Sequence, residues 1–338
     1  MKTLQITDKG QTRVIDTPKP ELQPSQVLLK IGYVGFCGSD LNTFRGLNPL
    51  VKLPIIPGHE IGAQIVEVGA EVPDVIKPGM NATVNPYTSC GHCPSCDNGR
   101  HNACEHNETF GVQRNGAMTE YIAVPWEKVI PDNAISVRDF ALVEPMSVGF
   151  HAVNRAQVTD SDTVLVFGCG MIGVGAIVRA ALRGARVIAV DVDDAKLALA
   201  QRLGAKFTIN SARECLSDRV MEITRGRGAD AVIEAVGRPE TYVAAINVAA
   251  FTGRVTYIGY AKADVAFNTS LFVKKELDIR GSRNATPADF KAVMEYLKRG
   301  DCPLDEFISA ICTPEKAQAA LENWQANPAQ VFRILVKF

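Results

Sequence analysis

The sequence predicts an α/β protein with two domains, one built on a doubly wound parallel sheet and the other rich in β-strands. From Thr163 onward, short apolar runs alternate with helical stretches, which is typical of a parallel sheet covered by helices on both faces. The first 150 residues contain short β-type runs separated by many Gly and Pro residues. A chain of 338 residues is also too long for one comfortable core, which favours two domains.

The expected elements follow the chain in that order. Residues 27–34 and 62–68 are predicted strands bounded by turn residues. The α/β part is predicted to hold strands at 164–167, 187–190, 231–235 and 254–258, and helices at 172–182, 194–203, 241–250 and 288–298. We expect the last β-type run, 331–338, to rejoin the first sheet. The β-rich domain would then be discontinuous, over 1–150 and 291–338, around a parallel-sheet domain at 151–290.

Composition excludes several classes of protein. The chain is 46% hydrophobic and 22% charged, as in ordinary soluble globular proteins. Its net charge of −1 provides no electrostatic footprint for nucleic acid or an anionic membrane, so we expect neither partner. No run approaches the roughly 18 apolar residues of a membrane span, and the N-terminus lacks the apolar stretch of a signal peptide. A cytoplasmic location fits these features.

Four cysteines in one short segment predict a structural zinc site. Cys90, Cys93, Cys96 and Cys104 have the spacing C-x2-C-x2-C-x7-C, and four thiolates in one loop can close a tetrahedral zinc site. A bacterial iron–sulfur run would have three residues before its last cysteine and a proline after it. Disulfides are the other alternative, but nine cysteines in a chain of this size do not make a secreted disulfide scaffold.

A glycine-rich motif predicts a dinucleotide site. The motif G-x-G-x-x-G follows the strand at 164–167 and opens the helix at 172–182, which is the context that the motif requires. Its residues are Gly168, Cys169, Gly170, Met171, Ile172 and Gly173. The N-terminus of that helix would face the pyrophosphate. Asp191 ends the next predicted strand, where a carboxylate accepts hydrogen bonds from the adenosine ribose and repels a 2′-phosphate. NAD is therefore favoured over NADP.

Three further segments predict a second, reactive metal site. Cys37-Gly38-Ser39-Asp40 follows a strand, Gly58-His59-Glu60 precedes another, and Glu144 begins the run E-P-M-S-V-G before the α/β part. Taken singly, each residue fits an ordinary core, surface or capping role. Together they provide one thiolate, one imidazole and two carboxylates. That ligand set, with one position left open, is what a catalytic zinc requires.

These motifs as a set resemble the zinc-dependent medium-chain dehydrogenases, in the branch with sorbitol, threonine and sugar-acid dehydrogenases. The resemblance covers essentially the whole chain. It implies a GroES-like catalytic domain, a Rossmann domain, and an alcohol/ketone oxidoreductase that uses NAD and two zinc ions per chain. It also implies a homodimer or homotetramer. It places Cys37 and His59 on the catalytic zinc. Alcohol dehydrogenases usually have a cysteine where this chain has Glu144, and whether Glu60 or Glu144 is the direct ligand stays open.

The resemblance also implies a mechanism. Zinc would bind the substrate hydroxyl and lower its pKa, hydride would pass to the nicotinamide, and Ser39 would accept the alcohol proton and pass it on. Many relatives carry a histidine five residues after the zinc cysteine, at the outer end of the proton relay, where this chain has Asn42. Because Asn does not titrate near neutral pH, we expect only a weak kinetic dependence near the histidine pKa.

Further residues are assigned to the cofactor and the substrate. Lys196 resembles a residue that contacts the adenosine half, and a group of residues at strand ends would shape the nicotinamide pocket: Glu234, Gly237, Ile258, Gly259 and Ser282. The run G-S-R-N-A-T-P-x-D-F looks like that of L-galactonate-type sugar-acid dehydrogenases. In it, Arg283 and Asn284 would contact the substrate, and the Arg283 guanidinium would suit a carboxylate. An ion pair or a subunit contact is the alternative role for Arg283.

The sequence thus predicts an NAD- and zinc-dependent dehydrogenase of a small-molecule sugar acid or polyol. A threonine-type dehydrogenase is the alternative within enzymes, and product identity would discriminate between the two. A cofactor-binding regulatory protein is the alternative outside enzymes, since the fold alone does not guarantee zinc catalysis. The complete set of Cys37, Ser39, His59, Glu60 and Glu144 argues against that loss of function.

Overall fold

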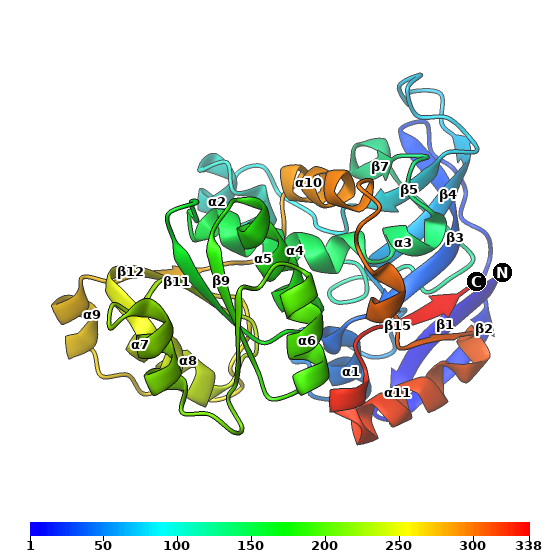
Figure 1. Cartoon of the computed structure of the whole chain (residues 1–338). Helices are drawn as coiled ribbons and strands as arrows, with labels where there is room; N and C mark the ends of the chain where they lie inside the picture. Colours follow the sequence, from blue (N-terminus) through cyan, green and yellow to red (C-terminus); the bar gives the residue numbers. More distant parts are fainter. The chain divides into compact units, whose positions relative to one another are not determined.

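The computed structural model describes residues 1–338 and divides into two compact units (Figure 1). Unit 1 comprises Met1–Glu144 and Phe290–Phe338, and unit 2 comprises Pro145–Asp289. The expected limits, 150/151 and 290/291, differ from these because both crossings lie inside helices, where the local sequence marks no boundary. Those helices are α4 (Val143–Arg155) and α10 (Pro287–Leu297).

Unit 1 contains a seven-stranded sheet in the order β14-β15-β3-β4-β5-β7, with β6 pairing β3, and a separate β1-β2 hairpin. Its strands are β1 (Lys2–Asp8), β2 (Gln11–Asp16), β3 (Gln26–Phe36), β4 (Glu60–Val68), β5 (Asn81–Val84), β6 (Tyr121–Pro125), β7 (Val129–Pro131), β14 (Ala310–Cys312) and β15 (Ile334–Lys337). Its helices are α1 (Gly38–Phe44), α2 (Pro94–Asp97), α3 (Val137–Phe140) and α11 (Ala317–Ala326). Strand β15 pairs antiparallel with β3, which confirms that the C-terminus rejoins the first sheet.

The central strand β3 explains why this sheet holds together. Val27–Leu29 and Val34–Phe36 are both continuously buried, Lys30 is the one exposed residue of this strand, and β4 and β15 flank it at Val34–Phe36. A buried apolar cluster, including Leu29, Ile31 and Ile61, forms the core of unit 1. Burial of such side chains contributes about 25 cal/mol per Å² of apolar surface. The sheet therefore offers a firm base for residues at the carboxyl end of β3.

Unit 2 is a six-stranded parallel sheet in the order β10-β9-β8-β11-β12-β13, which confirms the predicted doubly wound fold. Its strands are β8 (Thr163–Phe167), β9 (Arg186–Asp191), β10 (Phe207–Asn210), β11 (Ala229–Glu234), β12 (Ala249–Tyr257) and β13 (Asp278–Gly281). Its helices are α5 (Met171–Leu182), α6 (Asp194–Arg202), α7 (Leu216–Thr224), α8 (Pro239–Val248) and α9 (Ser270–Lys275). The strand order reverses between β8 and β11, and ligands bind beyond the carboxyl ends of strands at such a reversal.

The sequence shows why these elements form. Strand β8 is a continuous apolar run, as expected for a strand buried on both faces. Helix α5 follows it with small residues on a buried face, and α6 is capped by Asp193, whose side chain accepts hydrogen bonds from Ala195 N and Lys196 N. No helix in the structure is both long and apolar enough to span a membrane.

Candidate functional site

The cysteine lobe lies in a loop of unit 1 and fits a structural zinc ion. The four sulfur atoms of Cys90, Cys93, Cys96 and Cys104 all lie within 4.8 Å of one another, and none forms a disulfide. The Cys93 and Cys104 sulfur atoms are 3.8 Å apart. With zinc–sulfur bonds of about 2.3 Å, the edge of a tetrahedral site is also roughly 3.8 Å. Hydrogen bonds from the backbone N–H groups of Glu105 and Cys96 lower the pKa of Cys93 to about 6, which favours the thiolate that binds zinc.

A second ligand cluster lies where β3 ends and β4 begins. Cys37 is the residue that precedes α1, and His59 and Glu60 stand at the start of β4; their ligand atoms lie within 4.8 Å of one another. Gly35 pairs directly with Glu60 in the β3–β4 register. A Cβ atom on Gly35 would lie 2.1 Å from Glu60 Oε2, so only glycine leaves space for this carboxylate. The sheet register therefore brings two distant segments to one site.

Several buried polar atoms of this cluster have no hydrogen-bond partner. They are His59 Nδ1 and both carboxylate oxygens of Glu60, a side chain with no exposed surface. Buried lone pairs without partners are costly unless a cation binds them. Nitrogen, oxygen and sulfur donors at this spacing are the ligands that zinc takes in catalytic sites. The cluster thus fits zinc on its own geometry.

The charges around the cluster favour the ligand form of Cys37. Burial opposes ionisation of this thiol, but its hydrogen bond with His59 and the charge of His59 lower the pKa of Cys37. Burial likewise opposes the charged imidazole, yet Cys37 raises the pKa of His59 well above its usual value. Burial also raises the pKa of Glu60 well above the usual range, against the charge of Arg333. Buried ionisable groups of this kind stay charged only when a group of opposite charge lies beside them.

Arg333 is a buried cation that the sequence did not identify. Its side chain is 6% exposed, and its Nη1 lies 3.1 Å from Glu60 Oε1, an ion pair without hydrogen-bond geometry. The same nitrogen donates to the Phe36 carbonyl oxygen at 2.6 Å. Arg333 precedes β15 by one residue, so the last strand of the chain carries a charge to the ligand cluster. A lone arginine near the C-terminus gives no signal of this in sequence.

Glu144 and Ser39 lie in the same unit with different surroundings. Glu144 is buried in the first turn of α4, and the Tyr87 hydroxyl donates a hydrogen bond to its Oε1. Glu144 lies near enough to influence His59 and Glu60 by its charge, but it is outside the close group of ligand atoms. The Ser39 hydroxyl is buried without a hydrogen-bond partner, in the first turn of α1. Sequence reasoning missed Tyr87, because nothing local marks it as a partner of Glu144.

The glycine motif forms a tight turn between β8 and α5. Gly168 has a positive φ of 85°, and Gly170 is the residue that caps α5. A Cβ atom on Gly173 would lie 1.8 Å from the Gly168 carbonyl oxygen, whereas one on Gly170 would meet nothing within 4 Å. Gly173 therefore permits contact of helix and turn, and Gly170 leaves open space at the helix N-terminus. Met171 and Ile172 form the first turn of α5.

Asp191 lies beside this turn, at the end of β9. Its Oδ2 accepts a hydrogen bond of 2.7 Å from Cys169 N, and its Oδ1 accepts from Val192 N at 2.8 Å. The carboxylate thus ties two loops together and keeps lone pairs for a ribose hydroxyl. Lys196 lies in the first turn of α6, which follows Asp191 directly.

The ends of β11 and β12 make contact through two glycines. A Cβ atom on Gly259 would lie 2.3 Å from Gly237 N, so these two chain segments approach more closely than other residues allow. Glu234 is fully buried, and its Oε1 accepts hydrogen bonds from Val236 N, Gly237 N and the Thr241 hydroxyl. Ile258 is buried beside this contact. Glu234 therefore has a structural role in holding the loop at the strand ends.

The predicted substrate residues follow β13. Ser282 is buried, and its N–H donates to the Tyr257 carbonyl oxygen at 2.9 Å. Arg283 is half-buried and Asn284 has a positive φ of 55°, and each already makes an interaction within the protein. These residues belong to unit 2, whereas the candidate metal ligands Cys37 and His59 belong to unit 1.

Comparisons with known proteins agree with both units. Residues 23–134 match the family model of the alcohol dehydrogenase GroES-like domain, and residues 172–299 match that of the zinc-binding dehydrogenases. The L-galactonate-5-dehydrogenase of Escherichia coli is 35% identical over 84% of this chain and 84% of that protein. The sorbitol dehydrogenase of Bacillus subtilis is 30% identical over 99% of this chain and 97% of that protein. An Escherichia coli alcohol dehydrogenase solved with NADH superposes with a TM-score of 0.91 at 27% identity, covering 100% of this chain and 99% of that chain.

The fold and the two ligand clusters therefore define an oxidoreductase that acts on alcohols, with a zinc-binding GroES-like unit and a Rossmann unit. Both named relatives are at least 30% identical to this chain and cover 84% or more of it, which is enough to assign the chain to their family. The chain belongs to the zinc-dependent medium-chain dehydrogenase family, in the branch of sugar-acid and polyol dehydrogenases.

Proposed function

We propose that this protein oxidises a secondary alcohol of a sugar acid, a hexonate, to the ketone, with NAD and zinc as cofactors. The observation that carries the proposal is the cluster of Cys37, His59 and Glu60, in which His59 Nδ1 and both Glu60 oxygens are buried without a hydrogen-bond partner. Bound zinc supplies Lewis-acid activation of the substrate hydroxyl, and NAD supplies the hydride acceptor. The E. coli L-galactonate-5-dehydrogenase supports a hexonate as the substrate class.

The residues of this chain would share the chemistry as follows. Cys37 and His59 hold the metal, and Glu60 or Glu144 completes its ligand set. The Ser39 hydroxyl, buried without a hydrogen-bond partner, would accept the proton that leaves the alcohol and pass its own proton on to water. Arg333 balances the buried charge of Glu60 and fixes its orientation. The geometry favours Glu60 as the direct ligand, because one of its carboxylate oxygens belongs to the close group and none of Glu144 does.

A matched pair of variants decides between the two carboxylates. Glu60→Gln and Glu144→Gln each keep the side-chain volume and remove one charge. We expect Glu60→Gln to lose the catalytic zinc on dialysis and Glu144→Gln to retain it, measured as zinc per chain. Cobalt substitution gives a second readout, because the visible spectrum reports the ligand set. Retention of metal in Glu60→Gln with loss in Glu144→Gln would reverse the assignment.

In the Rossmann unit, Gly168, Gly170 and Gly173 would hold the pyrophosphate at the N-terminus of α5. Asp191 would accept hydrogen bonds from the adenosine ribose and repel a 2′-phosphate, so we propose NAD rather than NADP. Lys196 would contact the adenosine half. At the strand ends, Glu234, Gly237, Ile258, Gly259 and Ser282 would shape the nicotinamide pocket.

Substrate identity is tested with NADH formation by the zinc-loaded protein across matched hexonates, hexitols and threonine. We propose that Arg283 binds the hexonate carboxylate with its two-pronged guanidinium, beside Asn284. Arg283→Ala should then raise KM for hexonates without changing KM for hexitols, and Arg283→Lys should restore only part of the affinity. Activity on hexitols that ignores Arg283 would identify a polyol dehydrogenase. Activity confined to threonine would identify the threonine-type alternative.

We also propose that the protein forms a homodimer or homotetramer. Strand β13 is the edge of the parallel sheet, Ile279 on it is 43% exposed, and Val273 on the neighbouring α9 is 85% exposed. Exposed apolar residues beside a sheet edge favour association with another chain. Sedimentation of the purified protein measures the mass, and a monomer at micromolar concentration would contradict this proposal.

A further inference from the structure

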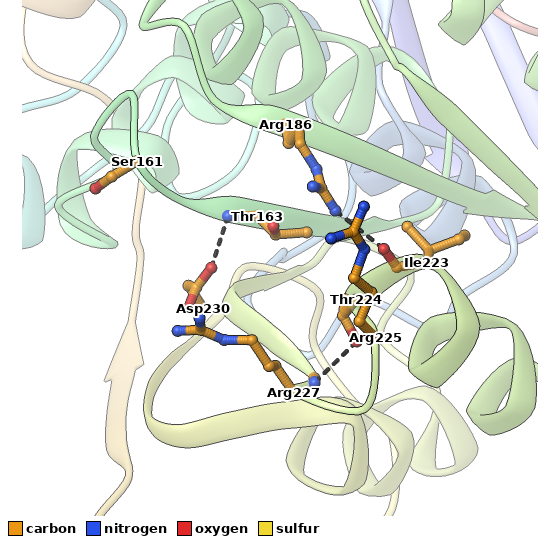
Figure 2. Close-up of a pocket in the computed structure, with 9 residues that line it drawn as sticks. Ser161, Thr163, Arg186, Ile223, Thr224, Arg225, Arg227 and Asp230 are labelled. Atoms are coloured by element: carbon orange, nitrogen blue, oxygen red, sulfur yellow. Dashed lines mark hydrogen bonds between the residues drawn. The ribbon is translucent and has the colours of Figure 1, made fainter.

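A pocket of about 350 Å³ lies at the amino ends of the parallel strands in unit 2 (Figure 2). Thr163 and Arg186 are the first residues of β8 and β9, and Asp230 is the second residue of β11. These three strands are neighbours in the sheet. The glycine motif begins at the other end of β8, five residues along the strand, roughly 16 Å away. The pocket is therefore separate from the dinucleotide site.

Three arginines line this pocket. They are Arg186, Arg225 and Arg227, and Asp230 is the single carboxylate among the lining residues, so the lining carries a net charge of +2. Figure 2 shows the side chains of Arg186 and Arg225 extending toward the same part of the pocket. Arg186 donates a hydrogen bond to the Ile223 carbonyl oxygen at 3.0 Å, and Asp230 accepts one from Thr163 N at 2.8 Å. Like charges gathered at one cavity attract an anion.

The loop that carries two of these arginines is held firmly by its backbone. Helix α7 ends at Thr224, whose hydroxyl accepts a hydrogen bond from Gly228 N at 2.9 Å and donates to the Val220 carbonyl oxygen. Gly226 N closes the helix end on the Met221 carbonyl oxygen at 2.7 Å. The segment from 225 to 228 is thus a fixed turn that presents its side chains in defined positions.

Arg225 stands in this turn at a position that disfavours it. Its φ is 54°, in the left-handed region, where glycine is the usual residue after a helix. A side chain kept there at an energetic cost points to a role for that side chain. Neither the Arg225 nor the Arg227 guanidinium has a hydrogen-bond or ion-pair partner in the chain. Both are therefore available to a ligand.

We propose that this pocket binds the phosphate group of a small phosphate monoester. Guanidinium groups bind phosphate oxygens through two parallel hydrogen bonds, and the Thr163 hydroxyl among the lining residues adds a neutral donor. A phosphate monoester carries a charge between about −1.5 and −2 at neutral pH, which matches the +2 of the lining. The volume is at the small end of ligand pockets, which suits a phosphate with a few attached carbon atoms. The proposal does not depend on which alcohol the enzyme oxidises.

Calorimetric titration of the NAD-saturated, zinc-loaded protein tests the site, since bound NAD occupies the phosphate-binding turn at Gly168–Gly173. The probes are glycerol 3-phosphate, inorganic phosphate and glycerol. We expect glycerol 3-phosphate to bind with a Kd below about 1 mM and glycerol not to bind. Arg225→Gly and Arg227→Gln should each weaken binding about tenfold, as for loss of one charged hydrogen bond. Arg225→Gly also relieves the backbone, so it should not lower the melting temperature.

Arg299→Gln is the matched control, because it removes one exposed arginine of unit 1 whose side chain is 53% exposed. It should leave Kd unchanged. Equal affinity for glycerol 3-phosphate and inorganic phosphate would support an anion site but overturn the part of the proposal that concerns the attached carbon atoms. Absence of binding up to about 20 mM would overturn the site. Binding that is unchanged in the Arg225→Gly/Arg227→Gln double variant would place the phosphate elsewhere, including the substrate site, and would also overturn it.

Discussion

Replacement of Gly173 by alanine should destabilise unit 2 and weaken cofactor binding together. The added Cβ atom would lie 1.8 Å from the Gly168 carbonyl oxygen, whereas real contacts of this kind are not shorter than 3.0 Å. The neighbour is a backbone atom, which cannot rotate away as a flexible side chain can. Helix α5 must therefore move away from the turn by more than 1 Å before this contact lengthens from 1.8 Å to 3.0 Å.

The size of the effect follows from two opposing contributions. Overpacking of a well-packed region costs about 1–3 kcal/mol, while alanine in place of glycine in a helix stabilises by up to about 1 kcal/mol. Because the clash is with backbone, we expect a net loss of about 2 kcal/mol. For a unit of this size that corresponds to a fall in Tm of roughly 4–8 °C. Calorimetry measures the Tm, and quenching of protein fluorescence by NADH measures the affinity.

Gly170→Ala is the matched control in the same turn. A Cβ atom there meets nothing within 4 Å and the φ of −74° is ordinary, so its Tm should stay within about 1 °C of wild type. It should still weaken NADH binding, because the methyl group would occupy the space that the pyrophosphate needs. A Gly173→Ala variant as stable as Gly170→Ala would refute the argument from close contact.

Three further predictions concern other parts of the chain. Cys93→Ser should remove one zinc per chain and lower the Tm, whereas Cys215→Ser, at an exposed cysteine outside the lobe, should change neither; metal analysis with calorimetry measures both. Burial alone would raise the pKa of Asp289, but its hydrogen bonds, above all the one with His151 at 2.9 Å, lower that pKa. A carboxyl group with a lowered pKa stabilises the folded protein above the unfolded pKa of about 4, and this stabilisation is lost as the pH falls further. Asp289→Asn should therefore melt below wild type at pH 7, and the two Tm values should converge toward pH 3. The hydride-transfer rate, followed in single turnovers, should vary little between pH 6 and 7 in wild type. Asn42→His should introduce a step in that rate at a pH of about 6.5. A step that is already present in wild type and survives His151→Asn would contradict the prediction of a weak pH dependence.

Local patterns in the sequence predicted much of the fold. The apolar run of β8, the glycine motif and the helix after it are contiguous, so neighbouring residues specify this strand, turn and helix together. The expected strand at 164–167 and helix at 172–182 agree with β8 (Thr163–Phe167) and α5 (Met171–Leu182) within one residue at each end. The four cysteines of the zinc lobe are also close in the chain, so their spacing alone predicted the cluster.

Residues brought together from distant segments were not predictable in the same way. Arg333 donates to the carbonyl of Phe36, 297 residues away, and nothing around Arg333 marks it as a partner of Glu60. Tyr87 contacts Glu144 across 57 residues. Short strands such as β14 and β7, three residues each, carry too little pattern for a prediction. Pairing across the sheet, rather than local preference, decides where these residues lie.

The position of β15 in its sheet has a consequence for synthesis of the protein. This strand lies between β14 and β3, and the residue before it is Arg333, yet it is synthesised only after all of unit 2. Unit 2, which is one continuous segment, can complete its sheet first. At about 5–20 residues per second, synthesis of the 194 residues after Glu144 takes roughly 10–40 s. During that interval Tyr33–Phe36 of β3 has no β15 to pair with, and the Glu60 carboxylate lacks its cation. Completion of the metal-binding unit therefore depends on the segment that follows unit 2 in the chain.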